Sequence, residues 1–115
     1  MVLRLSAALC GVALFVALPL AANAQSGIAS VYAYSGGETA SGEPASPQAM
    51  TAAHKSLPFG SKVRVTNLRN GRSAVVRIND RGPFVRGRII DVTPAAAHAL
   101  GFNGLAPVKI EVVHS

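Results

Sequence analysis

The sequence predicts a small all-β domain that closes into a compact barrel, and three observations predict it. Short segments such as residues 62–66 alternate polar and apolar side chains with the period of two that half-buried strands show. Asn70-Gly71 lies between two such segments, and its tolerance of positive φ makes it a strong hairpin signal. Several short strands separated by glycine and proline, with one short helical segment, are typical of small closed sheets.

The first strand and a hairpin are expected in the first two thirds of the chain. Residues 27–33 alternate small residues with β-branched or aromatic ones, which favours a strand. Residues 35–47 are rich in Gly, Ser and Pro and are expected to form a loop. Residues 62–66 and 73–78 are the two arms of the hairpin, the second with Ala74, Val76 and Ile78 on one face.

Two more strands and one helix are expected in the last third of the chain. Residues 87–92 form a short, mostly apolar strand. Thr93 can cap a helix that has Pro94 at its first position, and Gly101 ends it. This helix is rich in alanine and small enough to plug one end of a barrel. Residues 107–113 close the chain as a fifth strand, with Val108, Ile110 and Val112 facing inward.

The N-terminal residues are expected to be a secretory signal peptide. Arg4 gives a positive start, an apolar run follows, and Ala22-Asn23-Ala24 matches the small-x-small pattern of a cleavage site. The run is too short and too rich in alanine for a membrane span, and Cys10 lies near its start, where no lipid anchor is expected. We therefore expect a signal peptide over residues 1–24 and one periplasmic, monomeric domain over residues 25–115, with no membrane anchor.

The charge of the chain favours an anionic partner but does not indicate nucleic acid. Lys and Arg number 11 against 5 Asp and Glu, which gives a formal net charge of +6. Such a surface attracts polyanions, and the bacterial wall, nucleic acid and anionic lipid all qualify. The basic residues are spread singly and no aromatic residues interleave with them, so a stacking platform for nucleic acid is not predicted.

Motif searches leave carboxylates as the groups able to carry chemistry. The chain has no H-x-x-x-H or C-x-x-C pattern, so no metal site or cofactor is expected. It also lacks the G-x-S-x-G elbow of a serine hydrolase and a glycine-rich phosphate loop before a helix. Glycosidic bond cleavage is the reaction class that depends most on carboxylates.

Four titratable residues are candidates, and each has a structural alternative. Asp91 interrupts an apolar strand, where desolvation raises a carboxyl pKa toward values useful to a general acid, but it could instead bind backbone amides at the Thr93 turn. Asp80 is either an Asx turn or a carboxylate held at the exit of a strand. Glu43 is by default a surface acid in a polar loop, and His54 is by default a packing residue.

These segments, taken in order, resemble the rare-lipoprotein-A family of double-psi β-barrel proteins, which are associated with septal lytic transglycosylase activity. The resemblance covers residues 27–113 and implies a single six-stranded double-psi β-barrel. It is carried by Thr39-Ala-Ser-Gly-Glu43, Thr51-Ala-Ala-His54, residues 57–67, Asn79-Asp-Arg-Gly-Pro-Phe84 and residues 87–92.

The resemblance implies an activity and a set of site residues. The substrate would be the glycan strands of peptidoglycan, cleaved endolytically to 1,6-anhydromuramic products. Catalytic roles fall on Glu43, His54, Asp80 and Asp91, and the sequence does not decide which aspartate is the acid/base. Substrate contacts are expected from Arg81, Tyr32 and Thr39.

Two departures and one alternative function accompany this resemblance. Ser46 stands where an acid often occurs three residues after the glutamate, and residues 29–34 lack the usual aromatic-Tyr-Gly arrangement. The alternative is a non-catalytic, expansin-like module that binds wall glycan. The small number of aromatic residues weighs against this alternative, because sugar-binding platforms usually stack rings on aromatic faces.

Overall fold

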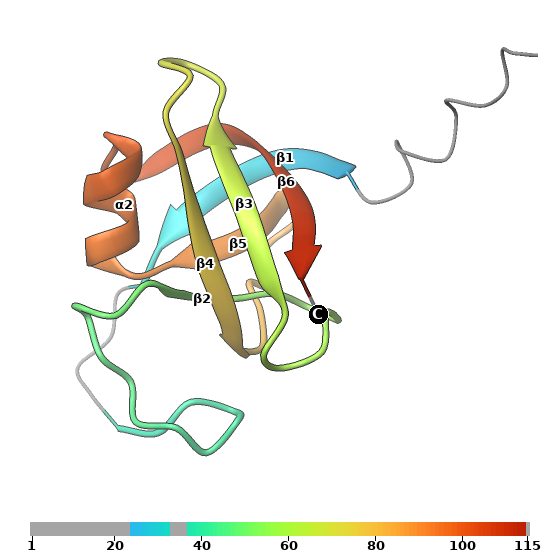
Figure 1. Ribbon diagram of the computed structural model, residues 1–115, viewed down its shortest axis with the longest axis vertical. Helices are drawn as coiled ribbons and strands as arrows, with labels where there is room; N and C mark the ends of the chain where they lie inside the picture. The colour runs from blue at the N-terminus through green and yellow to red at the C-terminus, as the bar shows by residue number, and fades with distance from the viewer. Residues whose placement is uncertain (1–23, 33–36, 115) are drawn as a thin grey trace, which may run out of the picture.

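Six strands form one closed barrel in the computed structural model, which describes residues 24–32 and 37–114 (Figure 1). Around the barrel the strands follow the order β1-β5-β2-β4-β3-β6. Their bounds are β1 (Ala24–Val31), β2 (Thr51–Ala53), β3 (Lys62–Asn67), β4 (Ser73–Asp80), β5 (Arg88–Val92) and β6 (Leu105–His114), and the helix is α2 (Pro94–Leu100). The predicted all-β barrel is confirmed, and it has the six strands that the family resemblance implies.

The barrel combines parallel and antiparallel pairs, so strands that are neighbours in space are often distant in sequence. β1 pairs with β5, and β2 with β4, in parallel, whereas the other four neighbouring pairs are antiparallel. A parallel pair requires a crossover connection, and these crossovers bring the ends of β4 and β5 to the two sides of the short strand β2.

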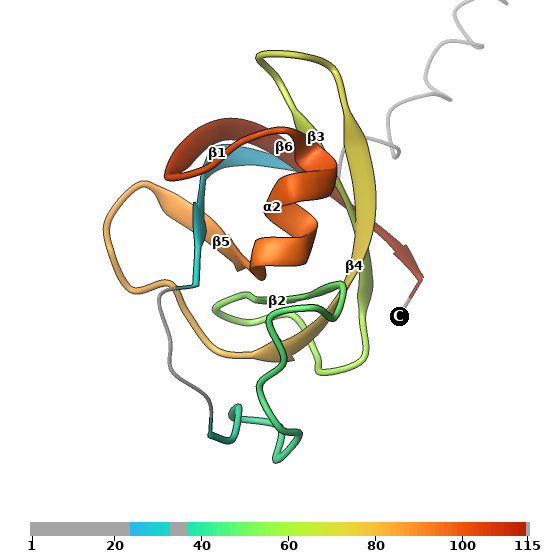
Figure 2. The ribbon, with the colours of Figure 1, turned by 90° about the vertical axis from the view of Figure 1, so that its left-hand side faces the viewer.

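The predicted hairpin and the predicted helix are both present. β3 and β4 pair antiparallel across the Asn70-Gly71 turn, where Gly71 has a φ of 76°. Thr93 caps α2 by accepting a hydrogen bond from the Ala96 amide at 3.2 Å, and Gly101 ends the helix in the left-handed region. Figure 2 shows α2 lying across one end of the barrel, where Ala96, Ala97 and Leu100 are buried in the core.

The structure differs from the prediction at β2 and at the start of β1. Thr51, Ala52 and Ala53 are all buried, so this three-residue strand has no alternation of polar and apolar side chains to reveal it. β1 begins at Ala24 rather than residue 27, because its first three residues are exposed and give no apolar signal. Residues 1–23 of the predicted signal peptide lie outside the described residues. In the part of the chain that is described, no helix has the length and apolar character needed to cross a membrane.

Candidate active site

Asp80 and Asp91 lie on the outer face of the barrel, on the two sides of β2. Ala53 is the register partner of Asp80 on β4 and of Asp91 on β5. Register partners point to the same face of a sheet, and the residues adjacent to Asp91, Ile90 and Val92, point into the core. The two carboxylates therefore flank a residue whose side chain is a single methyl group.

A β-bulge gives Asp80 this outward direction. The register between β2 and β4 shifts so that Ile78 opposes Ala52 while Asp80 opposes Ala53, which leaves Asn79 as the extra residue. Since side chains alternate between faces, a regular strand would place Asn79 opposite Ala53 and turn Asp80 inward. Bulges commonly redirect a side chain next to a functional site.

The Asp80 carboxylate is fixed by donors from three segments of the chain. Its Oδ1 accepts hydrogen bonds from the amides of Ala40 and Arg81, both at 2.9 Å. Its Oδ2 accepts a hydrogen bond from the Tyr32 hydroxyl at 2.8 Å. The bond from Arg81 is the local turn contact that the structural alternative required, but the contacts to Ala40 and Tyr32 are long-range. The carboxylate is thus held in one orientation at the strand exit.

Asp91 occupies a different environment, in which it is half-buried and accepts a hydrogen bond from a hydroxyl group. The Ser30 hydroxyl on β1 donates a hydrogen bond to Asp91 Oδ1 at 3.2 Å. Burial raises the pKa of Asp91 above its ordinary value of 3.8 and the charge of Asp80 adds to this, while the Ser30 hydrogen bond and Arg88 act in the opposite direction. The amides at the Thr93 turn bind elsewhere, that of Thr93 to the Thr51 carbonyl. The structural alternative for Asp91 is therefore not what the structure shows.

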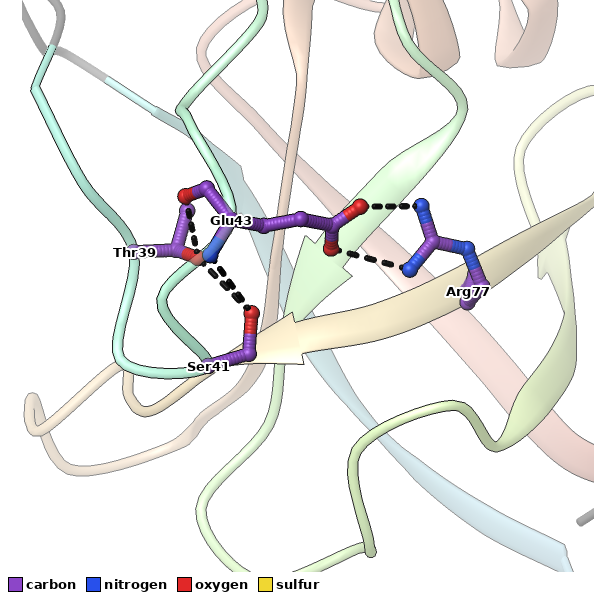
Figure 3. A network of polar contacts seen from close by, with 4 residues as sticks. All are labelled: Thr39, Ser41, Glu43 and Arg77. Atoms are coloured by element: carbon purple, nitrogen blue, oxygen red, sulfur yellow. Dashed lines mark hydrogen bonds and ion pairs between the residues drawn. The ribbon is translucent and has the colours of Figure 1, made fainter.

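Glu43 forms a bidentate ion pair with Arg77 on β4 (Figure 3). The two N···O distances are 2.9 and 2.7 Å. The hydrogen bonds from Arg77 lower the pKa of Glu43 to about 2, and Asn79 contributes in the same direction. Both carboxylate oxygens accept bonds from a cation, so Glu43 is an ionised anchor in this structure.

The loop that carries Glu43 is attached to the end of β4 beside the aspartates. Thr39, which is buried, bonds to the Glu43 carbonyl through both its amide and its hydroxyl at 2.8 Å (Figure 3). The next two residues then reach β4, since the Ala40 amide binds Asp80 and the Ser41 amide donates to the Asn79 carbonyl at 3.2 Å. The ion pair of Glu43 therefore helps to place one of the donors that orient Asp80.

Replacing Glu43 with glutamine should lower stability slightly and remove a pH dependence. The ion pair is 40% and 38% exposed, so its loss should cost no more than about 1 kcal/mol of unfolding free energy. Because the folded pKa of about 2 lies below the ordinary 4.5, this stabilisation is present above pH 4.5 and is lost as the pH falls toward 2. Urea unfolding of both proteins from pH 2.5 to 7 measures it.

The control for Glu43→Gln is Glu111→Gln. Glu111 lies 3.9 Å from Lys109 in a monodentate pair of similar exposure on β6. This variant should change the free energy of unfolding less than Glu43→Gln does at neutral pH. A difference between wild type and Glu43→Gln that stays constant down to pH 2.5 would contradict the proposed anchor.

The imidazole of His54 points away from the two aspartates. Its Nδ1 accepts hydrogen bonds from the amides of Ser56 and Leu57, both at 3.1 Å, so the proton lies on Nε2, which is 3.2 Å from Gln25 Oε1. Burial lowers the pKa of His54, and the charges of Arg81 and Lys55 add to this effect. The hydrogen bond between His54 and Asp80 joins their backbones, the His54 amide donating to the Asp80 carbonyl at 3.2 Å.

The ring of His54 borders a hollow rather than the row of carboxylates. This hollow, of about 330 Å³, is lined by Ala24 and Gln25 of β1, by Ile110 and Val112 of β6, and by Ser56 and Leu57 next to His54. Within the described parts of the chain, no hydrogen bond joins the imidazole to Glu43, Asp80 or Asp91. The family resemblance groups His54 with the acids. In the structure the His54 backbone is bound to Asp80, whereas its ring is bound to Ser56, Leu57 and Gln25.

Replacing His54 with alanine should cost about 1–3 kcal/mol of unfolding free energy, because two amides lose their acceptor. Since the folded pKa of His54 is below 6.5, its contribution is present above pH 6.5 and is lost as the pH falls. His54→Asn offers an acceptor near Nδ1 without a titrating ring. The free energy of unfolding of His54→Asn should be higher than that of His54→Ala. Between pH 7.5 and 5 it should decrease less than the free energy of unfolding of the wild type does. An equal decrease in the free energy of unfolding in the two variants, measured by urea unfolding, would refute the role of His54 as acceptor for the Ser56 and Leu57 amides.

Arg81 connects the exit of β4 to the loop that follows β2. Its Nη1 donates hydrogen bonds to the carbonyls of His54 and Leu57, at 3.2 and 2.8 Å. Its guanidinium lies 4.0 Å from the centre of the Phe59 ring. Arg81, Tyr32 and Thr39, which were predicted as substrate contacts, thus all bind protein groups that shape the site. No group of three or more His, Cys, Asp or Glu that could hold a metal ion occurs among the described residues.

Comparisons with known proteins show the family to which this sequence is similar. Residues 24–111 match the family model described as lytic transglycolase. Proteins named probable endolytic peptidoglycan transglycosylase RlpA from Nostoc sp. and endolytic peptidoglycan transglycosylase RlpA from Pasteurella multocida are similar, with 62% and 52% identity over 93 and 94 residues. The alignments cover 76% and 78% of this chain but 25% and 32% of those proteins, so the chain spans a quarter to a third of their length.

Two solved structures share the fold at low sequence identity. The apo expansin of Clavibacter michiganensis has a TM-score of 0.64 and 23% identity, covering 80% of this chain and 51% of that chain. A Streptomyces papain inhibitor has a TM-score of 0.62 and 23% identity, covering 81% of this chain and 96% of that chain. At this identity the likeness concerns the barrel alone.

Proposed function

The chain belongs to the lytic transglycolase family, and from this premise we propose that it is an endolytic transglycosylase that cleaves the glycan strands of peptidoglycan. The observation that carries the proposal is the pair of outward carboxylates on the two sides of Ala53, held in different environments. One is oriented by three donors, and the other has a raised pKa. Such a pair supplies an acid and a fixed negative charge at one place.

In the proposed mechanism Asp91 is the general acid and then the base. Its raised pKa favours the protonated form, which gives its proton to the glycosidic oxygen while the bond from that oxygen to C1 breaks. The Asp80 carboxylate, oriented by its three donors, stabilises the positive charge that develops on the sugar. The 6-hydroxyl of the muramic acid then attacks C1, and its proton returns to Asp91. The product carries a 1,6-anhydro end, and no water is consumed.

We further propose that the remaining predicted residues position this pair. Glu43 and Thr39 hold the loop that places the Ala40 amide at Asp80, and Tyr32 binds the same carboxylate directly. His54 and Arg81 order the loop after β2 through bonds to its backbone. Their contribution to turnover would act through the geometry of the carboxylates.

We also propose that residues 1–24 are a cleaved signal peptide and that the barrel works in the periplasm, where its substrate lies. Cleavage after Ala24 would remove the first residue of β1 and leave the pairing of Gln25 with Ile110 and of the residues after it. N-terminal sequencing of the exported protein would identify the cleavage site.

The decisive experiment is digestion of purified glycan strands by the mature protein, followed by mass spectrometry of the products. We expect muropeptides or glycan fragments that end in 1,6-anhydromuramic acid, with internal bonds cleaved from early times. Reducing ends in place of anhydro ends would show hydrolysis by water and would rule out the proposed mechanism.

One alternative is a module that binds wall glycan without cleaving it. The observation in its favour is the shared fold with expansin, for which one solved structure is described as a mutant in complex with cellohexaose, with a TM-score of 0.60. Glycan binding by the mature protein with no product after long incubation would favour this alternative over the enzyme.

A further inference from the structure

The segment 81–87, which joins β4 to β5, presents an apolar tip to solvent. Phe84 is 79% exposed, more than any other large apolar side chain of the described residues, and Val85 beside it is 51% exposed. Figure 2 shows this segment projecting from the barrel as an arm between the end of β4 and β5. A single exposed apolar residue is ordinary on a protein surface, so a functional role for the tip depends on the residues that surround it.

The segment 81–87 adjoins the proposed active site along the chain. It starts directly after Asp80 and leads into β5, the strand that carries Asp91. Its first residue is bound at both backbone and side chain, since the Arg81 amide donates to Asp80 and its guanidinium to the Leu57 carbonyl. Its last residue is bound to β1, since the Gly87 carbonyl accepts a hydrogen bond from the Ile28 amide at 3.1 Å. The segment is thus anchored at both ends, at one end directly after Asp80 and at the other four residues before Asp91.

The ring of Phe84 rests on the backbone of a glycine. Gly82 is buried, and a Cβ placed there would lie 3.4 Å from Cε2 of Phe84. The φ of Gly82 is +120°, a conformation that side-chain-bearing residues rarely adopt. One side of the ring is therefore supported by Gly82 while most of its surface is open to solvent.

A second aromatic ring lies on the neighbouring loop that Arg81 ties to the same place. Phe59 is 43% exposed, and the Arg81 guanidinium covers one of its faces at 4.0 Å. The connection between the two loops is direct, through the bonds from Arg81 to the carbonyls of His54 and Leu57. Two partly exposed rings, Phe59 and Phe84, thus lie on the two loops that Arg81 connects at the end of β4, next to Asp80.

We propose that Phe84 is a substrate-positioning residue whose open ring stacks against the apolar C–H face of a pyranose in the bound glycan. This inference rests on the proposed function and deepens it, since it names the group that holds a sugar beside the carboxylates. A ring face carries partial negative charge and attracts the C–H groups that line one face of a pyranose. The bonds at Arg81 and Gly87 restrict the segment that carries the ring before the glycan binds, which lowers the ordering cost of binding.

The chemistry favours a glycan over a lipid surface as the partner. The apolar tip consists of two side chains, Phe84 and Val85, in the segment that follows Asp80, and Asp80 belongs to a row of polar groups with Ser30 and Asp91. A glycan offers apolar faces and hydroxyl groups side by side, which matches this mixture. Arg81 and Arg86 flank the tip and would attract an anionic lipid, but two apolar side chains offer little area for insertion into a bilayer.

The test compares Phe84→Ala, Phe84→Leu and Phe84→Trp with the control Leu68→Ala. Leu68 is 54% exposed in the turn between β3 and β4, at the opposite end of β4 from Asp80. We expect Phe84→Ala and Phe84→Leu to raise KM for purified glycan strands about 2- to 10-fold with little change in kcat. Phe84→Trp should retain the wild-type KM, and so should Leu68→Ala. All four variants should unfold at the wild-type denaturant midpoint.

The same variants, made in an Asp91→Asn background, separate this inference from the proposed reaction. Binding to the strands, measured by equilibrium sedimentation, should weaken about 2- to 10-fold on Phe84→Ala even if no bond is cleaved. Absence of anhydro products from the wild-type protein, together with binding that depends on Phe84, would contradict the proposed reaction and leave the stacking role. Wild-type binding by Phe84→Leu would overturn stacking. Loss of binding to phosphatidylglycerol vesicles on Phe84→Ala, with glycan binding unchanged, would assign the tip to lipid instead.

Discussion

Asp91→Asn should lose most glycan cleavage while remaining folded and able to bind glycan. Asparagine keeps the shape of the side chain and can still accept the Ser30 hydrogen bond, but it cannot give a proton to the leaving oxygen. General acid catalysis of this kind typically contributes about 10²- to 10⁴-fold to a rate, so we expect a loss in that range. Release of anhydro ends by the variant and by wild type, at saturating strands, measures the effect.

The pH dependence of the same residue gives a second readout. Its folded pKa is raised, so the protonated acid is depleted as the pH rises through that value, and kcat of the wild type should fall on this alkaline limb. The raised pKa also means that the folded state binds this proton more tightly than the unfolded state, so the stability linked to it is lost as the pH rises. Asp91→Asn should therefore be at least as stable as wild type at pH 7.

Ser30→Ala is the matched control for Asp91→Asn. It removes the hydrogen bond that lowers the pKa of Asp91 and keeps the carboxyl, so the alkaline limb of kcat should move to higher pH with turnover retained. Undiminished cleavage by Asp91→Asn would eliminate Asp91 as the acid, whatever its pKa.

The strands that the sequence predicted well are those whose two faces differ. β3, β4 and β6 each alternate between solvent and core, and their inward residues, such as Val65, Val76 and Ile110, are the ones the periodicity selected. β2 has no such contrast because all of its residues are buried, so period-two analysis has nothing to detect. The sixth strand followed only from resemblance to a family.

The candidate residues could be selected from the sequence, but their grouping could not. Asp80 and Asp91 meet across β2 because of one parallel pairing, one antiparallel pairing and a bulge at Asn79, and none of these leaves a local pattern in the chain. His54 follows Ala53, the residue between the two aspartates, but its ring accepts hydrogen bonds from the amides of Ser56 and Leu57 and not from a group at the carboxylates. The exposure of the Phe84 ring depends on the path of the segment between β4 and β5, so the sequence alone does not reveal it.

Asp80→Asn should keep the fold and still lower turnover by about 10²- to 10³-fold. The asparagine Oδ1 can accept the amides of Ala40 and Arg81 as the carboxylate does, and the Tyr32 hydroxyl can rotate to accept from the new Nδ2. What disappears is the negative charge beside the developing oxocarbenium ion, and preorganised charge of this kind is worth a factor of that size. The kcat for anhydro product, with glycan binding measured in parallel, tests this.

Tyr32→Phe and Asp80→Ala separate the charge of Asp80 from its role in the turn. Tyr32→Phe removes one donor and keeps the Asp80 carboxyl group, so turnover should fall far less than in Asp80→Asn. Asp80→Ala leaves the Ala40 and Arg81 amides without their acceptor, which should cost about 1–3 kcal/mol of unfolding free energy in addition to turnover. If Asp80 served only as an Asx turn, asparagine would replace it fully, since asparagine also caps turns. Wild-type turnover in Asp80→Asn with loss in Asp80→Ala would then be the observed pattern, and the charge would have no part in the reaction.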